Sequence, residues 1–301
     1  MCKNGQTVEP KCEMSKEYVN FSKKNLEKLK GVPLGAELLN HRAVKEVNSY
    51  AGTLLTDQQK VSMLSACFEI NFAYRIHAAN LSAEYEFKTG MGNGSVDFKI
   101  NGNIGEKNWL CELTCSQESE ATKECKTEWV TNGIPYQGYN SEKCVSSAFP
   151  NSGESRDIMK IQRALLYKTF NKKPIKFPDD TECYHAIVIN VDAFCGGGAD
   201  DLDCLHAAYG GEAVPDYAKR RVVPETKTRE GTECRSDLIH GIFQKKHPFP
   251  TEASHLQKTL DIIVFVGTKL EDKYLILPNC KYEINQSKEI KSKFLGLGLY
   301  S

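Results

Sequence analysis

Residues 95–115 read SVDFKINGNIGEKNWLCELTC, and this stretch decides the fold that the sequence predicts. Apolar and polar residues alternate in SVDFKI (95–100), and a turn rich in glycine and asparagine separates it from the apolar WLCELTC (109–115). Upstream, SAEYEFKTG (82–90) and the turn MGNG precede the first of these two segments. Together the three segments predict three consecutive antiparallel strands.

Helical patterns lie on both sides of these strands. A cap at Thr56 and an apolar repeat every three to four residues predict a helix that runs to about Ala79. RDIMKIQRALLYKTF (156–170) predicts a second helix, and YHAIVINVDAF (184–194) is typical of a buried parallel strand. The order helix, three strands, helix, strand predicts an α/β fold, in which a central mixed sheet of about four or five strands is flanked by helices.

The rest of the chain extends this core at both ends. Residues 1–60 predict an N-terminal helical extension, with helical periodicity at 18–29 and 36–47. Residues 61–195 form the predicted core, and residues 196–301 a C-terminal extension that completes the sheet with a hairpin of DIIVFVGTK and KYLILPN.

Two stretches are predicted to be irregular. The variable region from Gln117 to Ser155 is rich in serine, glutamate, glycine and asparagine, and we expect a loop there with a short helix of its own. CGGGADDLDC (195–204) predicts a flexible acidic loop.

Composition excludes several classes of protein. The 301 residues include 39 basic and 39 acidic side chains, so net charge predicts no long-range attraction to polyanions. With 26% charged and 40% hydrophobic residues, the chain is not of a disordered, collagen-like or coiled-coil type. The longest apolar runs are strand-sized, and the opening MCKNGQTVEPKCEMSKE has no apolar signal region. Twelve cysteines without a Cys-x-x-Cys pair indicate reduced thiols, so we expect a cytoplasmic protein without a membrane partner.

Two acidic residues stand in the middle strands. By alternation, Asp97 lies on the face opposite the apolar Val96, Phe98 and Ile100, and Glu112 lies opposite the odd-numbered residues of WLCELTC. The two carboxylates converge if the register places them across from each other. Paired carboxylates repel, and a divalent cation that binds both relieves the repulsion.

A structural alternative stays open for this pair. A carboxylate in the middle of an apolar strand needs a partner, and Glu112 finds one if it forms a salt bridge with Lys99 or lies at an exposed edge. Asp97 is then a solvated strand residue.

With these residues, the sequence resembles the PD-(D/E)xK nuclease-like superfamily, also called restriction-endonuclease-like. The resemblance lies in Asp97 of SVDF and Glu112 of CELT, in Glu69 on the preceding helix, and in Gln162 and Lys168 on the following helix. It covers roughly residues 64–192 and implies a restriction-endonuclease-like core.

Two departures from the family pattern matter. Val96 stands where the family has a proline before the aspartate, and Thr114 stands where it has a lysine two residues after the glutamate. Some members supply that positive charge from the second helix, where Gln162 and Lys168 fall on opposite shoulders of the buried stripe. Alternatively, Lys168 extends to water at the helix end.

The resemblance implies a metal-dependent phosphodiester hydrolase that acts on nucleic acid, as a DNA endonuclease of restriction or defence type. Asp97, Glu112 and Glu69 would hold one or two Mg²⁺ ions, Lys168 would orient the attacking water, and Gln162 would complete the site. The alternative is a catalytically inactive nuclease-like domain that binds nucleic acid or protein, as Thr114 would permit. Many members of this superfamily work as homodimers, which makes a homodimer one expected form.

Basic residues outside this set are candidates for phosphate contacts, or else belong to solvated surface. They are Lys99, Lys172, Lys173, Lys219, Arg220 and Arg221.

Other constellations compete with the carboxylate pair. Asp200, Asp201 and Asp203 have the short spacing of calcium loops but lack the distal glutamate. Cys111, Cys115 and Cys125 could ligate an iron–sulfur cluster, although the first two also suit the packed face of a strand.

Histidines offer a third kind of site. Cys195 with His185 or His206 would suit a thiol hydrolase, but no nucleophile signature surrounds this cysteine. His240, His247 and His255 show no metal-ligand spacing and are expected in loops.

Overall fold

The structure of the chain is a computed structural model. It describes residues 16–52, 55–91, 94–102, 106–116, 126–131, 134–139, 158, 160–166, 177–178, 182–191, 201–211, 240–244, 250–267 and 274–300.

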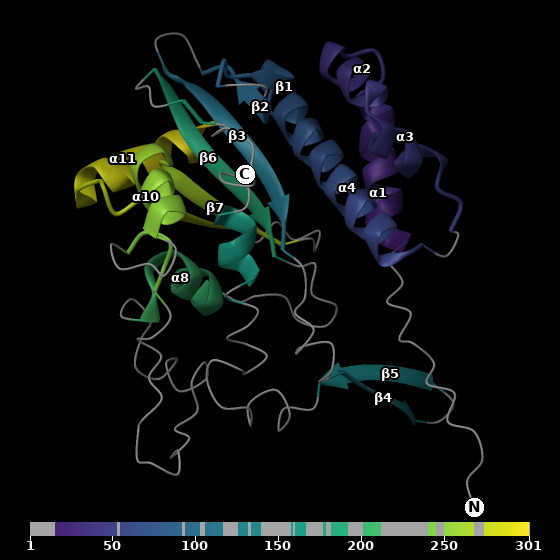
Figure 1. The fold of residues 1–301 in the computed structure, drawn as a ribbon. Helices are drawn as coiled ribbons and strands as arrows, with labels where there is room; N and C mark the ends of the chain where they lie inside the picture. The colour runs from purple at the N-terminus through teal and green to yellow at the C-terminus, as the bar shows by residue number, and fades with distance from the viewer. Residues whose placement is uncertain are drawn as a thin grey trace, which may run out of the picture.

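The described part of the chain forms an α/β fold around a six-stranded mixed sheet, which confirms the predicted class (Figure 1). The strand order is β1-β2-β3-β6-β7-β8. The strands are β1 (Ala83–Lys88), β2 (Ser95–Ile100), β3 (Asn108–Cys115), β6 (Cys183–Asn190), β7 (Ile262–Val266) and β8 (Tyr274–Pro278). As predicted, β1, β2 and β3 pair antiparallel, β6 is parallel to β3, and β7 and β8 form an antiparallel pair. β7 is parallel to β6.

Helices cover both faces of this sheet. They are α1 (Lys16–Lys28), α2 (Pro33–Asn40), α3 (Arg42–Ser49), α4 (Asp57–Ala78), α8 (Asp201–Tyr209), α10 (Pro250–Thr259), α11 (Ile284–Gly296) and the helical residues 160–166. The predicted cap of α4 is confirmed, because the Thr56 side chain accepts from the Gln59 backbone at 3.3 Å and the Gln59 side chain accepts from the Thr56 backbone at 2.9 Å. None of the described helices is long and apolar enough to cross a membrane.

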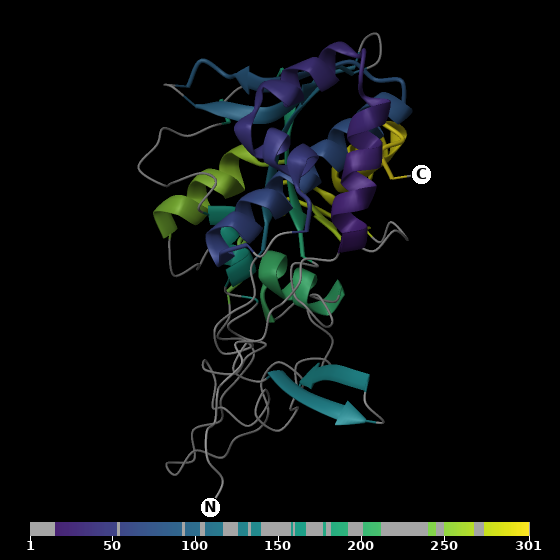
Figure 2. The ribbon, with the colours of Figure 1, turned by 90° about the vertical axis from the view of Figure 1, so that its right-hand side faces the viewer.

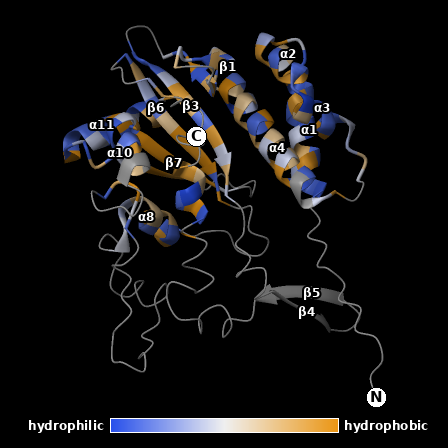
Figure 3. Cartoon of the chain, in the orientation of Figure 1, coloured by the Kyte–Doolittle hydropathy of each residue, from blue (hydrophilic) through white to orange (hydrophobic). Residues whose placement is uncertain are grey.

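Two hydrophobic cores lie on opposite faces of the sheet. The first core joins the sheet to α1, α2, α3, α4 and α11, and the second joins it to residues 160–166, α8 and α10. Figure 2 shows α10 and α11 on opposite sides of the strands, and Figure 3 shows that the central strands are mostly hydrophobic, whereas the helices mix hydrophobic and hydrophilic residues. The strands β6 and β7 contribute alternate residues to the two cores, which explains why they read as continuous apolar runs.

Several elements differ from the sequence prediction. The helix predicted at 36–47 is two helices that break at His41, whose backbone is extended (φ −73°, ψ 132°), directly after the weak helix former Asn40. Part of the stretch predicted as a loop with a short helix forms a hairpin of β4 (Lys126–Thr131) and β5 (Ile134–Tyr139). The Asn-Gly dipeptide between these strands is a strong hairpin signal that the prediction did not use.

The C-terminal extension holds more helix than predicted. Residues 201–204 of the predicted acidic loop lie in α8, with Asp201 and Asp203 in its first turn, where carboxylates suit the helix dipole. His255, predicted in a loop, lies in α10. The sequence prediction also missed α11, which docks through Phe294 against Trp109 of β3, with ring centroids 5.0 Å apart.

Phe294 provides a test of how much this docking contributes. Because its ring is buried against the sheet, Phe294→Ala should lower the free energy of unfolding by about 3–5 kcal/mol in urea titrations. Its neighbour Leu295 is 39% exposed, so Leu295→Ala should change the free energy by less than about 0.5 kcal/mol. Equal effects of the two substitutions would contradict this packing.

Candidate functional site

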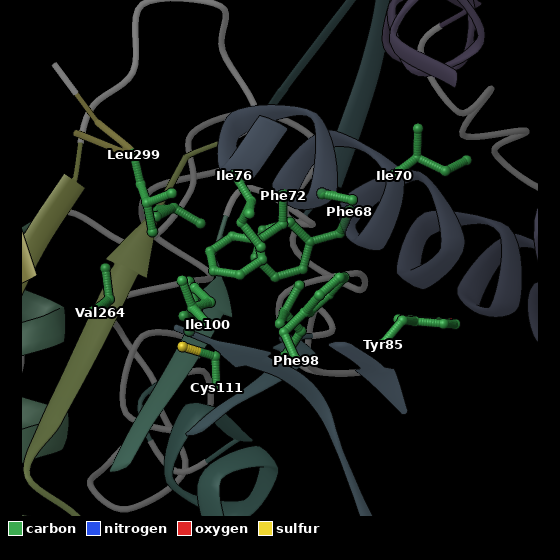
Figure 4. Packing of buried hydrophobic residues seen from close by; sticks show 14 of the residues in the cluster. Phe68, Ile70, Phe72, Ile76, Tyr85, Phe98, Ile100, Cys111, Val264 and Leu299 are labelled. Atoms are coloured by element: carbon green, nitrogen blue, oxygen red, sulfur yellow. The ribbon is translucent and has the colours of Figure 1, made fainter. Parts of the chain in front are cut away.

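The β1–β2 hairpin is twisted, so that its inward-pointing side chains pack on one face of the sheet at one end and on the other face at the other end. Tyr85 and Phe98, which are register partners, pack in the first core (Figure 4). The next register partners that point inward, Phe87 and Val96, pack with the second core. Alternation alone would keep Val96 on the face of Phe98, so that part of the sequence prediction is wrong. The twist is located between these two pairs, where Glu86 has a left-handed backbone with φ of 52°.

Asp97 lies at this twist and bonds to the neighbouring strand. Its carboxylate Oδ2 accepts a hydrogen bond from the backbone N–H of Leu113 at 2.5 Å. The pairing of Phe98 with Cys111, continued along the strands, would bring Val96 opposite Leu113. The side chain of Asp97 therefore takes the place of a backbone partner in the ladder, and regular pairing of β2 with β3 ends here. Asp97 is buried, which contradicts the alternative of a solvated strand residue.

Glu112 is fully buried on the central strand β3, with a relative exposure of 0%. Its register partner on β6 is Ile187, a residue of the second core, and Leu110 on the same face of β3 belongs to that core too. The alternative of an exposed edge is therefore wrong. Lys99, the other proposed partner, forms its ion pair with Glu84 at 2.9 Å.

Regular pairing of β2 with β3 ends at Phe98–Cys111. Continued by one residue, the register would set Asp97 opposite Glu112, which is the arrangement on which the predicted carboxylate pair depends. The side chain of Asp97 lies near Tyr85 and Cys111 of the first core, whereas Glu112 stands on the face of the second core.

Glu69 reaches this region through Tyr85. The Tyr85 hydroxyl donates a hydrogen bond to Glu69 Oε2 at 2.6 Å, and Glu69 belongs to α4. Burial raises the pKa of Tyr85 well above its ordinary value, and the carboxylates of Glu69, Glu86 and Asp97 raise it further. Tyr85 is therefore close to both Glu69 and Asp97. The sequence prediction missed this tyrosine, although its place between the polar residues of AEYEFK marks it as an inward-facing side chain.

Gln162, on the second predicted helix, bonds to elements other than β2 and β3. Gln162 is buried, and its amide donates to the backbone carbonyl groups of Ala207 at 3.1 Å and His240 at 2.7 Å. These bonds tie residues 160–166 to α8 and to the segment 240–244, and they connect Gln162 to neither predicted carboxylate. Lys168 lies outside the described residues.

The competing cysteine and aspartate sites find less support in the described residues. Cys111 is fully buried in the first core and its thiol is free, and burial raises its pKa, as suits a packing residue. Asp201 and Asp203 begin a helix instead of lining a loop. Cys125 and Asp200 lie outside the described residues.

Two of the candidate histidines, His185 and His206, are buried. His185 is buried on β6, where its Nδ1 lies 2.9 Å from the carbonyl oxygen of Thr259 and its ring stacks on Phe177. His206 is buried in α8. Cys195 and His247, together with the basic residues 172, 173 and 219–221, lie outside the described residues.

The donor set at Asp97 and Glu112 suits a hard cation. Within the ranges that the structure describes, no three His, Cys, Asp or Glu side chains are grouped closely enough to hold a metal ion. Mg²⁺ commonly takes only one or two protein carboxylates and completes its shell with water and substrate phosphates. A set of two carboxylates therefore fits Mg²⁺ better than a metal that needs a complete protein cage.

Comparison with protein-family models, with curated proteins and with solved structures finds no match to this chain.

The bond between Asp97 and Leu113 can be isolated with two substitutions that remove the same charge. Asp97→Asn keeps an oxygen acceptor for the Leu113 N–H, whereas Asp97→Ala leaves this buried donor without one. Asp97→Ala should therefore be less stable than Asp97→Asn by about 1–3 kcal/mol in urea titrations. Equal stabilities would show that the side chain does not replace a ladder bond.

The raised pKa of Tyr85 predicts a loss of stability in alkali. Above the ordinary tyrosine pKa of about 10, the unfolded chain releases the phenol proton while the folded chain keeps it. Stability from this group is therefore complete below that pH and declines as the pH rises. The stability advantage of the wild type over Tyr85→Phe should shrink between pH 9 and pH 11, by up to about 1.4 kcal/mol per unit above the unfolded pKa. A constant difference across this range would contradict the assignment.

Proposed function

We propose that this chain is a metal-dependent phosphodiester hydrolase that acts on nucleic acid, with DNA as its substrate. The observation that carries the proposal is a buried carboxylate on each of two adjacent strands, Asp97 on β2 and Glu112 on β3, which the β2–β3 register would oppose if it continued by one residue. A buried pair of carboxylates is costly in a structural role and common in metal-dependent chemistry.

The order of elements supports the resemblance to the PD-(D/E)xK nuclease-like superfamily. Helix α4 is followed by the antiparallel strands β1, β2 and β3, then by the helical residues 160–166, and then by β6, which lies parallel to β3. The sequence resemblance implies this helix, three strands, helix, strand order. Membership of the superfamily and a restriction or defence role are part of the proposal, as are a cytoplasmic location and a homodimeric form.

The residues of the site have distinct roles in this proposal. Asp97 and Glu112 would hold Mg²⁺, and the Leu113 N–H fixes the orientation of Asp97 through its 2.5 Å hydrogen bond. Tyr85 orients Glu69 of α4, the third carboxylate of the proposed set, through its hydrogen bond. When bound, Mg²⁺ polarises the phosphodiester and lowers the pKa of a bound water. The buried setting of the pair excludes bulk water and strengthens electrostatic interactions with the substrate.

A second candidate function is a nuclease-like domain that binds nucleic acid without cleaving it. Two observations favour it: Thr114 stands where the family has lysine, and the Gln162 amide is already bonded to two backbone carbonyl groups. In this function the Asp97–Glu112 pair would remain from an ancestral metal site.

Cleavage of supercoiled plasmid and single-stranded DNA in Mg²⁺ separates the two functions. The wild type should cleave in Mg²⁺ and stop in EDTA. Asp97→Asn and Glu112→Gln, which keep side-chain shape but remove one charge each, should lower the rate by at least about 100-fold. Glu46→Gln changes an exposed glutamate of α3 and should keep the wild-type rate.

Other outcomes of the binding and cleavage assays would contradict one or both of the proposed functions. A wild type that binds DNA in a gel-shift assay but does not cleave it in Mg²⁺ or Mn²⁺ would replace the hydrolase by the binding module. Cleavage that survives in both Asp97→Asn and Glu112→Gln would remove the carboxylate pair from the mechanism. A wild type that neither binds nor cleaves nucleic acid would contradict both functions.

A further inference from the structure

Helix α11 carries two exposed apolar residues, and Figure 1 shows this helix, in yellow, at the outer edge of the described fold. Among the residues that the structure describes, the exposed large apolar side chains are those of Tyr274, Ile284 and Leu295. Ile284 begins α11 and is 76% exposed, and Leu295 lies in its last turn and is 39% exposed. The helix docks on the sheet through its buried residues Ile290 and Phe294, so docking does not account for the exposed pair.

Two lysines lie between these apolar residues on the same stripe of the helix. Lys288 and Lys291 follow Ile284 by four and seven residues, and Leu295 follows it by eleven, which is the spacing of one helix face. Both lysines are exposed. The apolar residues lie roughly 16 Å apart along the helix, with the lysines between them. Because the lysines are three residues apart, their like charges repel.

The acidic residues of this segment have other partners. Glu289 pairs with Lys293 at 2.7 Å, and Lys293 also donates a hydrogen bond to the Tyr184 hydroxyl at 3.0 Å. The Glu283 side chain accepts from the backbone of the third helical residue, in the capping box of α11. Within the described part of the chain, Lys288 and Lys291 therefore have no acidic partner.

Charge argues against a second copy of this chain on the stripe. If two α11 helices packed antiparallel about a two-fold axis, Ile284 of one copy would face Leu295 of the other. The same symmetry would set Lys288 of one copy against Lys291 of the other, so that like charges would be opposed twice. A parallel pair would oppose each lysine to its own counterpart. A nucleic-acid backbone would satisfy the lysines but would leave the two apolar side chains uncovered.

We propose that this stripe of α11, made of Ile284, Lys288, Lys291 and Leu295, docks an acidic amphipathic helix of another protein. Apolar side chains of the partner would cover the two ends of the stripe, and acidic side chains between them would pair with the lysines. The same carboxylates would relieve the repulsion between the lysines. The stripe is one side of a single helix, so it fits a weak, transient complex. This inference does not depend on the proposed hydrolase function.

Fluorescence anisotropy of the full chain with a labelled synthetic peptide tests the stripe. The peptide is an alanine-based helix with two leucines eleven residues apart and glutamates between them at the spacing of the two lysines. It should bind at low salt with a Kd of about 10–100 µM, and a version with lysines in place of the glutamates should not bind. Lys288→Glu should weaken the binding by at least about fivefold, and Ile284→Ser by at least about threefold. Lys45→Glu, the matched control, changes an exposed lysine of α3 and should keep the Kd within about twofold.

Lys288→Glu is suited to this test because it should not harm the fold. It replaces the repulsion with Lys291 by an attraction, in the favourable order with the acidic residue nearer the N-terminus of the helix. Its Tm, followed by circular dichroism, should therefore be no lower than that of the wild type. If the Tm does fall, Lys291→Glu decides in the same binding assay, and a Kd within about twofold of the wild type would overturn the proposal.

Other occupants of the stripe give different results, and each would overturn the proposal. A wild type that does not bind the acidic peptide, or that binds the lysine version equally well, has no acidic docking surface here. If it instead binds a short DNA duplex or phosphatidylserine vesicles, and Lys288→Glu weakens that binding, the stripe contacts nucleic acid or membrane. If sedimentation shows self-association that Lys288→Glu strengthens, the stripe binds a second copy, because the new carboxylate would face Lys291 of that copy. None of these results bears on the hydrolase function, which the cleavage assays test.

Discussion

The hydrogen bond from the Leu113 backbone to the Asp97 carboxylate is the contact on which this site depends. It ends the regular ladder between β2 and β3 and holds an acidic side chain between two strands that would otherwise pair through their backbones. The twist at Glu86 on β1 makes room for it, because the tip of the hairpin turns toward the second core. Glu112, on the neighbouring strand β3, is fully buried on the face of the second core.

This arrangement conflicts with stability in a way that is typical of functional sites. Burial of a carboxylate costs free energy unless a partner compensates for the lost water. A protein without use for the pair could replace it by apolar residues and extend the β2–β3 ladder. The apolar residues around the pair, such as Leu110, Val96 and Ile187, pack normally in the second core. The conflict is therefore confined to the residues that carry the proposed chemistry.

The sequence predicted the strands, their antiparallel order and the unusual place of Glu112, because each depends on local alternation and turn residues. It predicted the wrong face for Val96, since alternation assumes a flat strand and the twist requires the left-handed conformation of Glu86. The partners of Gln162 could not be predicted, because Ala207 and His240 are 45 and 78 residues away along the chain. Tyr85 was missed for a similar reason, since its role depends on Glu69 of a different element.

The account makes one central claim, that the Asp97 and Glu112 carboxylates share a pocket that binds a divalent cation. Anomalous scattering from crystals of the full chain soaked in Mn²⁺ tests it most directly, because Mn²⁺ takes the same oxygen ligands as Mg²⁺. The account predicts an anomalous peak between the two carboxylates, within bonding distance of an oxygen of each. Carboxylates that turn to opposite faces of the sheet, or an open pocket without a peak, would contradict it.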